Sequence, residues 1–200
     1  MKKSTLTILA ILFLASCGEQ GEIECIVESH EIYGGTNGSE LAAEQVLRKN
    51  NGAEPGTLDP HRAEGVPASN VLRDLFEGLV IELPSGEYTP GVAESWTVSA
   101  DAKKYVFKIR QNAKWSNGDN FTAHDFVYSL RRSVDPKTLS NYSSMLYPIK
   151  NARAIVLGEL QPERLGVYAD SEKTLRIELE EPTPYFLSLL THSTTYPVHR

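Results

Sequence analysis

Apolar and polar residues alternate in the middle of the chain with the two-residue period of a half-buried strand. Tyr105, Phe107 and Ile109 occupy every second position of one such stretch. This alternation places the apolar side chains on one face of a sheet. Residues 93–98 give a second strand signal, and the polar residues 99–103 lie between the two. We therefore predict two half-buried strands joined by a turn.

Three other segments carry strand signals. Residues 79–83 form a compact apolar run that ends at the turn residues 84–86. Residues 166–180 have the pattern of a hairpin whose turn lies at 170–173. Residues 46–52 begin with two apolar residues and end in Asn-Asn-Gly, which predicts a short strand followed by a turn.

Helical periodicity marks two longer segments. Residues 67–77 begin with Pro67, a residue favoured in the first helical turn, and their apolar residues recur at helical spacing. In residues 123–133, Thr122 precedes Asp125 by three positions, which is the spacing of a capping box. Two shorter helical segments are also expected, at 142–158 with an interruption at Pro148 and at 184–190.

The first 17 residues have the pattern of a bacterial lipoprotein export signal. Two lysines precede the apolar run 6–14, which is too short for a permanent membrane helix, and small residues come directly before Cys17. We predict a signal peptide at 1–16, a lipid on Cys17 and a flexible tether over 17–44. A plain signal peptide or an N-terminal anchor remains the alternative.

Composition narrows the possible partners. The chain has 40% hydrophobic and 23% charged residues, which suits a globular domain. The formal net charge of −6 becomes −8 once Lys2 and Lys3 are removed with the signal, so we expect no nucleic-acid partner. Only Cys25 would remain beside a lipidated Cys17, which leaves no pair for an intramolecular disulfide.

A series of motifs, in order along the chain, resembles one known family. They are Asn50–Gly52, Leu58–His61, Glu64–Pro67, Asp74–Leu79, Pro90–Trp96, Ala113–Gly118, Thr122–Ser129, Asp135–Pro136 and Glu181–Phe186. From about Gln45 to the last residue, the chain is similar to the periplasmic oligopeptide-binding proteins of ABC importers, which are family 5 of the extracytoplasmic solute-binding proteins. The match covers only the N-terminal portion of that family.

The resemblance implies a mixed α/β (α+β) fold of the periplasmic-binding-protein-like type II class. Residues 45–76 would begin lobe one with a strand, the ligand loop and a helix, and residues 77–200 would form the family's extra domain and reach the return to lobe one. The second lobe would be absent and the chain incomplete. The implied function is capture of oligopeptides by hinge closure and their delivery to an ABC permease and its ATPases, with no cofactor and no catalysis.

The resemblance also carries over to four binding residues. Glu64, Gly65 and Val66 resemble a loop whose main chain pairs with the bound peptide in strand fashion, and such pairing tolerates many peptide sequences. Gly65 would allow the ligand backbone to approach, while Glu64 would line the cleft. Tyr142 resembles a tyrosine whose hydroxyl reaches the peptide near its amino end. Taken alone, Glu64 would be an exposed loop acid and Tyr142 a packing residue.

Several other functions remain open. A murein-tripeptide binder of the same family shares much of the pattern, and a truncated structural lipoprotein would need no cleft. A secreted hydrolase could use Asp59 and Glu64 with His61, although only their proximity in sequence supports it. No histidine has a companion at metal-ligand spacing, so we expect no metal site. We assign Trp96 and Trp115 to packing.

Overall fold

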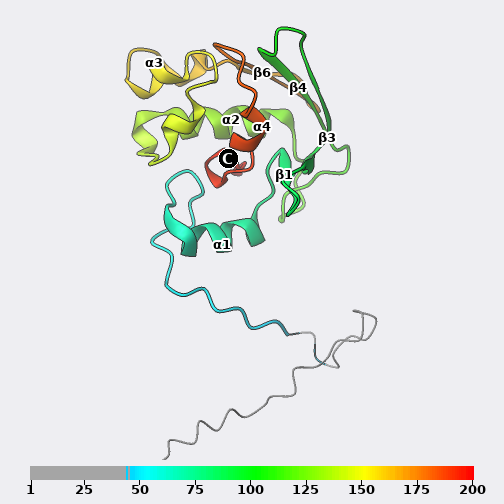
Figure 1. Ribbon diagram of the computed structural model, residues 1–200, viewed down its shortest axis with the longest axis vertical. Coiled ribbons are helices and arrows are strands. Elements are labelled where there is room, and N and C mark those ends of the chain that lie inside the picture. The colour runs from blue at the N-terminus through cyan, green and yellow to red at the C-terminus, as the bar shows by residue number, and fades with distance from the viewer. Residues whose placement is uncertain (1–43, 45) are drawn as a thin grey trace, which may run out of the picture. The chain divides into compact units, whose positions relative to one another are not determined.

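A computed structural model describes residue 44 and residues 46–200, so the predicted signal, the lipidation site Cys17 and nearly all of the tether lie outside the described residues. The helices are α1 (Gly65–Leu75), α2 (Ala123–Val134), α3 (Ala152–Val156) and α4 (Phe186–Leu189), with short 3-10 turns η1 (Pro136–Thr138), η2 (Ser143–Leu146), η3 (Pro162–Arg164) and η4 (Ser193–Thr195). The strands are β1 (Val80–Glu82), β2 (Tyr88–Pro90), β3 (Ala93–Val98), β4 (Lys104–Ile109), β5 (Val167–Ser171) and β6 (Thr174–Glu178) (Figure 1).

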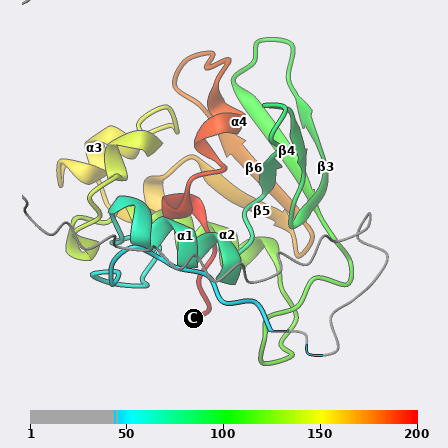
Figure 2. The ribbon, with the colours of Figure 1, turned by 60° about the horizontal axis from the view of Figure 1, so that its bottom comes forward.

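A four-stranded antiparallel sheet in the order β3-β4-β6-β5 forms the largest element of the fold. Strands β3, β4 and β6 run side by side in both ribbon views (Figures 1 and 2). The alternating residues Tyr105, Phe107 and Ile109 of β4 are all buried on one face of the sheet. Helix α2 packs on the sheet over β5 and β6, and its Phe126 and Leu130 are fully buried. The alternation that predicted β4 therefore marks the main core.

Both tryptophans are partly buried and pack against the main core. Trp96 packs against Phe107 with ring centroids 6.4 Å apart, and Trp115 packs against Phe121 at 4.9 Å. The packing role predicted for them is confirmed.

Helix α1 begins and ends two residues earlier than predicted. Phe76 leaves the helix in an extended conformation, with φ −124° and ψ 156°. The chain must straighten there because Gly78 and Leu79 pair with the backbone of residues 91–93. A Cβ on Gly91 would lie 2.5 Å from the Gly78 carbonyl oxygen, so this close approach requires glycine. Strand β2, which pairs with β1, was missed by the sequence pattern.

The strand predicted at 46–52 is wrong. These residues have no strand structure, and Val46 and Leu47 are 58% and 89% exposed. A strand is stabilised by hydrogen bonds to a neighbouring strand, and none of the described strands pairs with this segment. The preference of residues 46–52 for an extended conformation is therefore not enough to form a strand without a partner.

The predicted helical segment 142–158 is more broken than its single proline suggests. It contains only the turn η2 and the five-residue helix α3. Between them, Asn151 takes a left-handed conformation with φ 67°, which a continuous helix cannot contain. The hairpin predicted at 166–180 is confirmed as β5 and β6.

The capping box predicted for α2 is present. The Asp125 carboxylate accepts hydrogen bonds from the Thr122 backbone N–H at 2.7 Å and from the Thr122 hydroxyl at 2.9 Å. At the other end of α2, Asp135 accepts from the Lys137 backbone N–H at the start of η1. The Asp125 side chain therefore caps the start of α2, and the Asp135 side chain caps the start of the turn that follows it.

We predict that Asp125→Ala lowers the free energy of unfolding by about 1 kcal/mol, because the Thr122 N–H loses its partner. Asp125→Asn keeps an acceptor at the same place and should lose less. Urea denaturation measures both changes, and equal losses in the two variants would contradict this role.

Candidate functional site

The four residues expected to bind a peptide line one small pocket of about 210 Å³. Glu64, Gly65 and Val66 lie at the start of α1, and Tyr142 comes from the segment before η2. The remaining lining residues are Ala63, Ser69, His192 and Ser193. Residues far apart in the sequence are thus brought to the same place.

The start of α1 exposes backbone donors beside this pocket. Glu64 occupies the N-cap position but its side chain makes no capping hydrogen bond, and the first turn has no acidic residue. The first N–H groups of a helix have no partner within the helix, so those of Gly65 and Val66 can donate to a ligand. Gly65 has φ 80°, and a Cβ there would meet only the Pro67 Cδ at 3.8 Å. The backbone conformation, rather than crowding, is what favours glycine at this position.

Tyr142 and His192 form the aromatic side of the pocket. Their rings meet edge to face with centroids 4.9 Å apart. The His192 Nδ1 accepts a hydrogen bond from the Thr194 backbone N–H at 3.2 Å, so the neutral ring carries its proton on Nε2. Burial, followed by the nearby charge of Arg73, lowers the pKa of His192. A phenol and an uncharged imidazole therefore stand beside the backbone donors of α1.

A half-buried charge cluster lies just before the Glu64 loop. The Arg132 guanidinium on α2 donates to Asp59 Oδ1 at 2.9 Å and to Asp59 Oδ2 at 2.5 Å. The side chains of Arg132 and Asp59 are only 29% and 25% exposed. Hydrogen bonding from Arg132 is the main cause that lowers the pKa of Asp59. Two parallel bonds of this kind fix both the distance and the orientation of the partners.

His61 completes this cluster in a single protonation state. Its Nε2 lies 2.9 Å from the Tyr196 carbonyl oxygen, which can only accept. Its Nδ1 lies 2.7 Å from the Arg132 Nη1, which can only donate. Both contacts are satisfied only by the neutral ring with its proton on Nε2. Burial is the main cause that lowers the pKa of His61 from 6.5 to about 4.

The same geometry bears on the hydrolase alternative. His61 is 1% exposed and both of its ring nitrogens are engaged, so it offers no free base to a substrate. Asp59 is committed to Arg132, whereas Glu64 is exposed and lines the pocket. The three residues are near one another in sequence but do not converge on a common reaction site.

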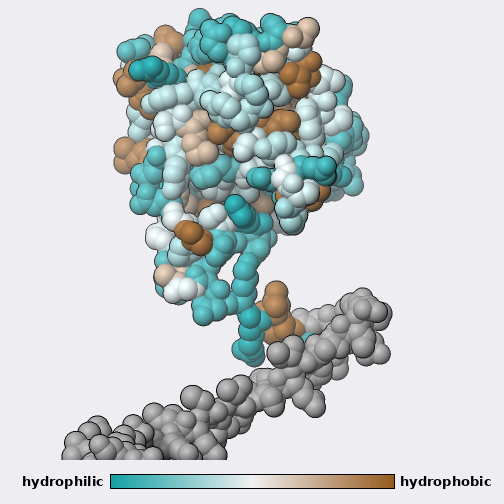
Figure 3. Space-filling model, in the orientation of Figure 1, coloured by the Kyte–Doolittle hydropathy of each residue, from teal (hydrophilic) through white to brown (hydrophobic). Residues whose placement is uncertain are grey.

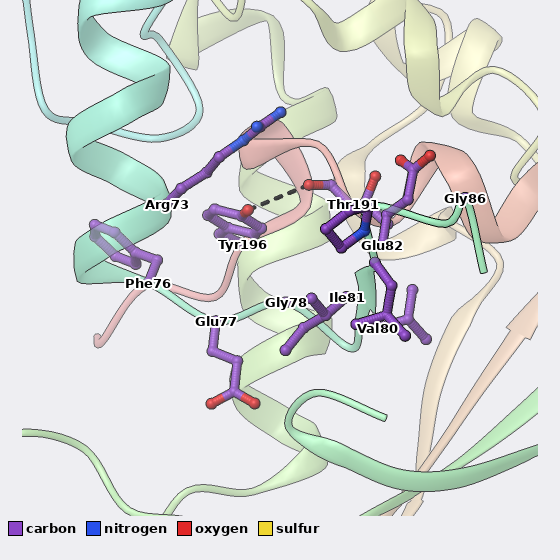
Figure 4. A pocket seen from close by; sticks show the side chains of 12 residues that line it. Arg73, Phe76, Glu77, Gly78, Val80, Ile81, Glu82, Gly86, Thr191 and Tyr196 are labelled. Carbon is purple, nitrogen blue, oxygen red and sulfur yellow. Dashed lines mark hydrogen bonds between the residues drawn. The ribbon is translucent and has the colours of Figure 1, made fainter. Parts of the chain in front are cut away.

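A larger hollow of about 580 Å³ lies at the other end of α1 (Figure 4). Phe76 and Tyr196 stack there with ring centroids 6.3 Å apart, and the Tyr196 hydroxyl donates to the Thr191 carbonyl oxygen. Both Arg73 and Glu77 line it. On the face drawn in Figure 3, apolar residues are scattered between polar ones. The hollow contains none of the residues expected to bind a peptide.

Sequence reasoning did not find His192 or Ser193 as pocket residues. His192 was considered only as a metal ligand, and no local pattern connects it with Tyr142.

Among residues 44 and 46–200, no three His, Cys, Asp or Glu side chains gather closely enough to hold a metal ion. The longest helix in this part of the chain has 12 residues, and none there has the length and apolar character of a membrane span.

Comparison with known proteins defines the class of the chain. The model of the bacterial extracellular solute-binding proteins, family 5 (middle part), matches residues 87–199, which is more than half of the chain. The chain belongs to this family, and its mixed α/β fold is that of periplasmic-binding-protein-like structures.

Individual relatives agree with this assignment. The periplasmic oligopeptide-binding protein OppA of Salmonella typhimurium is 50% identical over 163 residues, and the periplasmic murein peptide-binding protein MppA of Escherichia coli is 45% identical over 166 residues. These matches cover 80% and 82% of this chain. The crystal structure of Haemophilus influenzae OppA in complex with RPPGFSPFR has a TM-score of 0.73 at 47% identity, covering 75% of this chain and 30% of that one. The chain spans about 30% of the length of the curated relatives it matches.

We predict that the stability of the fold decreases as the pH falls from about 6.5 to about 4. The unfolded His61 ring takes up a proton near pH 6.5, whereas the folded ring does so only near pH 4. The contribution of the neutral His61 ring to the free energy of unfolding is therefore fully present above pH 6.5. It is lost as the pH falls to about 4, and the loss amounts to up to about 3 kcal/mol. His192 changes in the same direction because its pKa is also lowered.

Urea denaturation at a series of pH values tests this effect. His61→Gln removes the titrating ring and should flatten the pH dependence between 6.5 and 4, even if the variant is less stable throughout. An unchanged slope in His61→Gln would show that other groups cause the dependence.

Proposed function

We propose that this chain is part of the substrate-binding component of an ABC peptide importer. It captures oligopeptides in the periplasm by main-chain pairing at Glu64, Gly65 and Val66, with Tyr142 near the peptide's amino end. The permease and its ATPases would receive the peptide. The convergence of these four residues on one pocket is the observation that carries the proposal.

The chemistry of the pocket supports recognition of a peptide main chain. The N–H groups at the start of α1, which have no partner within the helix, are donors for carbonyl oxygens, and the Tyr142 hydroxyl can accept from an ammonium group. Glu64 adds an exposed carboxylate that attracts cationic groups. Backbone pairing gives affinity without fixing the side chains of the ligand.

A murein tripeptide is the second candidate ligand. The relative MppA, whose name describes murein peptide binding, is 45% identical to this chain. A non-binding structural lipoprotein would lack affinity for either ligand. The engaged nitrogens of His61 and the binding relatives argue against a hydrolase.

The proposed domain division follows from the resemblance. Residues 45–76 would belong to lobe one and residues 77–200 to the extra domain, with a signal at 1–16 and a tether at 17–44. Contacts such as Asp59 with Arg132 cross the boundary at 76. The periplasmic location is supported by the names of the relatives, and the lipid anchor on Cys17 is supported by the pattern of the first 17 residues.

Isothermal calorimetry tests the proposed ligand class. The protein should be the longest soluble product of the native locus that contains residues 45–200, titrated with tri- to pentapeptides and with a murein tripeptide. Tyr142→Phe should weaken peptide binding by about 10- to 100-fold, because a hydrogen bond to a charged group is lost. Tyr185→Phe makes the same chemical change at a 61% exposed tyrosine outside this pocket, and it should bind as the unsubstituted protein does.

Each outcome separates the alternatives. Preference for the murein tripeptide over unmodified tripeptides would favour the second ligand. Equal weakening in Tyr142→Phe and Tyr185→Phe would remove Tyr142 from the site. If the protein is folded but binds no peptide, the structural lipoprotein is the function that remains.

We predict that the membrane-bound form of the protein carries a diacylglyceryl group at Cys17, because acyl chains provide the membrane affinity. Mass spectrometry of the membrane fraction should find this group, and Cys17→Ser should lack it. A membrane-bound form of the unsubstituted protein whose Cys17 carries no lipid would instead indicate an anchor formed by the uncleaved N-terminus.

A further inference from the structure

The candidate peptide pocket has three walls that come from separate parts of the chain. The first wall is Ala63–Val66, the second is Tyr142, and the third is His192–Ser193. None of these walls follows another directly in sequence. The shape of the pocket therefore depends on contacts behind it that hold the three segments together.

Arg132 lies behind the first wall and outside the pocket lining. From the last turn of α2 it binds both carboxylate oxygens of Asp59, and the same guanidinium reaches His61 Nδ1. Asp59 in turn accepts the backbone N–H of His61 at 3.1 Å, and its carbonyl oxygen accepts from the Ala63 N–H at 2.8 Å. Arg132 is thus connected to the first residue of the wall through one compact turn.

His61 connects this turn with the third wall. Its Nε2–H donates to the Tyr196 carbonyl oxygen at 2.9 Å, and the Tyr196 N–H donates to the Ser193 carbonyl oxygen at 2.9 Å. Ser133, the neighbour of Arg132 on α2, donates to the Thr194 carbonyl oxygen at 2.6 Å. Turn η4 therefore contacts α2 directly and the His61 turn through Tyr196, and it lies between α1 and α2 (Figure 1).

The second wall is connected to the same turn. The Asn141 side-chain amide donates to the Arg62 carbonyl oxygen at 3.2 Å, directly before Tyr142. Arg62 itself lies between His61 and Ala63, and its N–H donates to the Asp59 carbonyl oxygen at 3.0 Å. All three walls are therefore joined to the turn at 59–63, which Arg132 holds from behind.

We propose that Arg132, acting through Asp59 and His61, is a positioning residue of the peptide site. It does not contact the peptide but fixes the backbone of Ala63–Val66 against Tyr142 and His192. The inference rests on the proposed function. It adds that affinity for peptide depends on a guanidinium outside the pocket, because backbone donors bind well only when they are held in place before the ligand arrives.

Arg132→Met and Arg132→Lys test this role, with Arg131→Met as the matched control. Methionine removes the charge and all donors, while lysine keeps the charge but replaces the planar fork of donors by a single ammonium nitrogen, which does not match the bidentate geometry at Asp59. Arg131 is the adjacent residue on α2, and its guanidinium donates instead to the Glu163 carbonyl oxygen at 3.1 Å. The longest soluble product that contains residues 45–200 should be used for all variants.

Two measurements are made at a temperature where every variant is folded. Calorimetry with a tripeptide that the unsubstituted protein binds should give about tenfold weaker binding for Arg132→Met, a smaller loss for Arg132→Lys, and less than about twofold for Arg131→Met. Without peptide, the amide NMR signal of Gly65 should shift or broaden in Arg132→Met and stay unchanged in Arg131→Met. A merely structural arginine would lower the melting temperature without moving the Gly65 signal or the affinity of the folded protein.

The possible outcomes separate the two proposals. If the unsubstituted protein binds no peptide, the proposed function fails and this inference fails with it. If it binds peptide and Arg132→Met binds equally well, only the positioning role is wrong. Should Arg132→Met not fold, Arg132→Lys decides the question: unchanged affinity together with an unchanged Gly65 signal overturns the inference.

Discussion

The bond between Arg132 and Asp59 is the constraint on which the arrangement of the pocket depends. It joins a helix of the main core to a turn 73 residues earlier in the chain. Both charges are mostly withdrawn from water, so each needs the other, and removing one partner would leave the other charge poorly solvated. His61 then fills the remaining space with a neutral ring that accepts from Arg132 and donates to Tyr196. Helix α2 thereby supports both the sheet and the polar turn behind the pocket.

This arrangement suits a site that recognises backbone rather than side chains. The pocket is small, about 210 Å³, and the donors at the start of α1 belong to the main chain. Every residue except proline supplies a main-chain donor, but the donor is useful only if the loop keeps its position. The side chains of Asp59, His61 and Arg132 lie behind the pocket and connect the loop to α2, whereas Tyr142 and Glu64 add side-chain groups to the main-chain donors within it. Such a division fits proteins that accept many peptide sequences.

Elements determined by local chemistry were predicted well from the sequence. The strand β4 follows from the alternation of Tyr105, Phe107 and Ile109, and α2 follows from its capping box. The strand expected at 46–52 was wrong because a strand also needs a neighbour, which no local pattern reveals. Strand β2 and the break at Asn151 depend likewise on the surrounding fold.

The site was predictable only in part. The resemblance indicated Glu64, Gly65, Val66 and Tyr142, and the structure brings them to one pocket, whereas their binding roles stay predictions. His192 and the contacts of Arg132 could not be found from the sequence. Both are recognised only from contacts in the folded structure, such as the one between Asp59 and Arg132. The spacing of these residues in the chain follows no recognisable motif.

Hydrogen exchange at the amides of Gly65 and Val66, measured with and without a bound tripeptide, tests the central claim most directly. Pairing of these donors with the peptide main chain predicts that both amides exchange more slowly in the complex, while an amide on the exposed turn at 99–103 keeps its rate. Binding of the peptide with unchanged exchange at Gly65 and Val66 would contradict the account and place the ligand elsewhere.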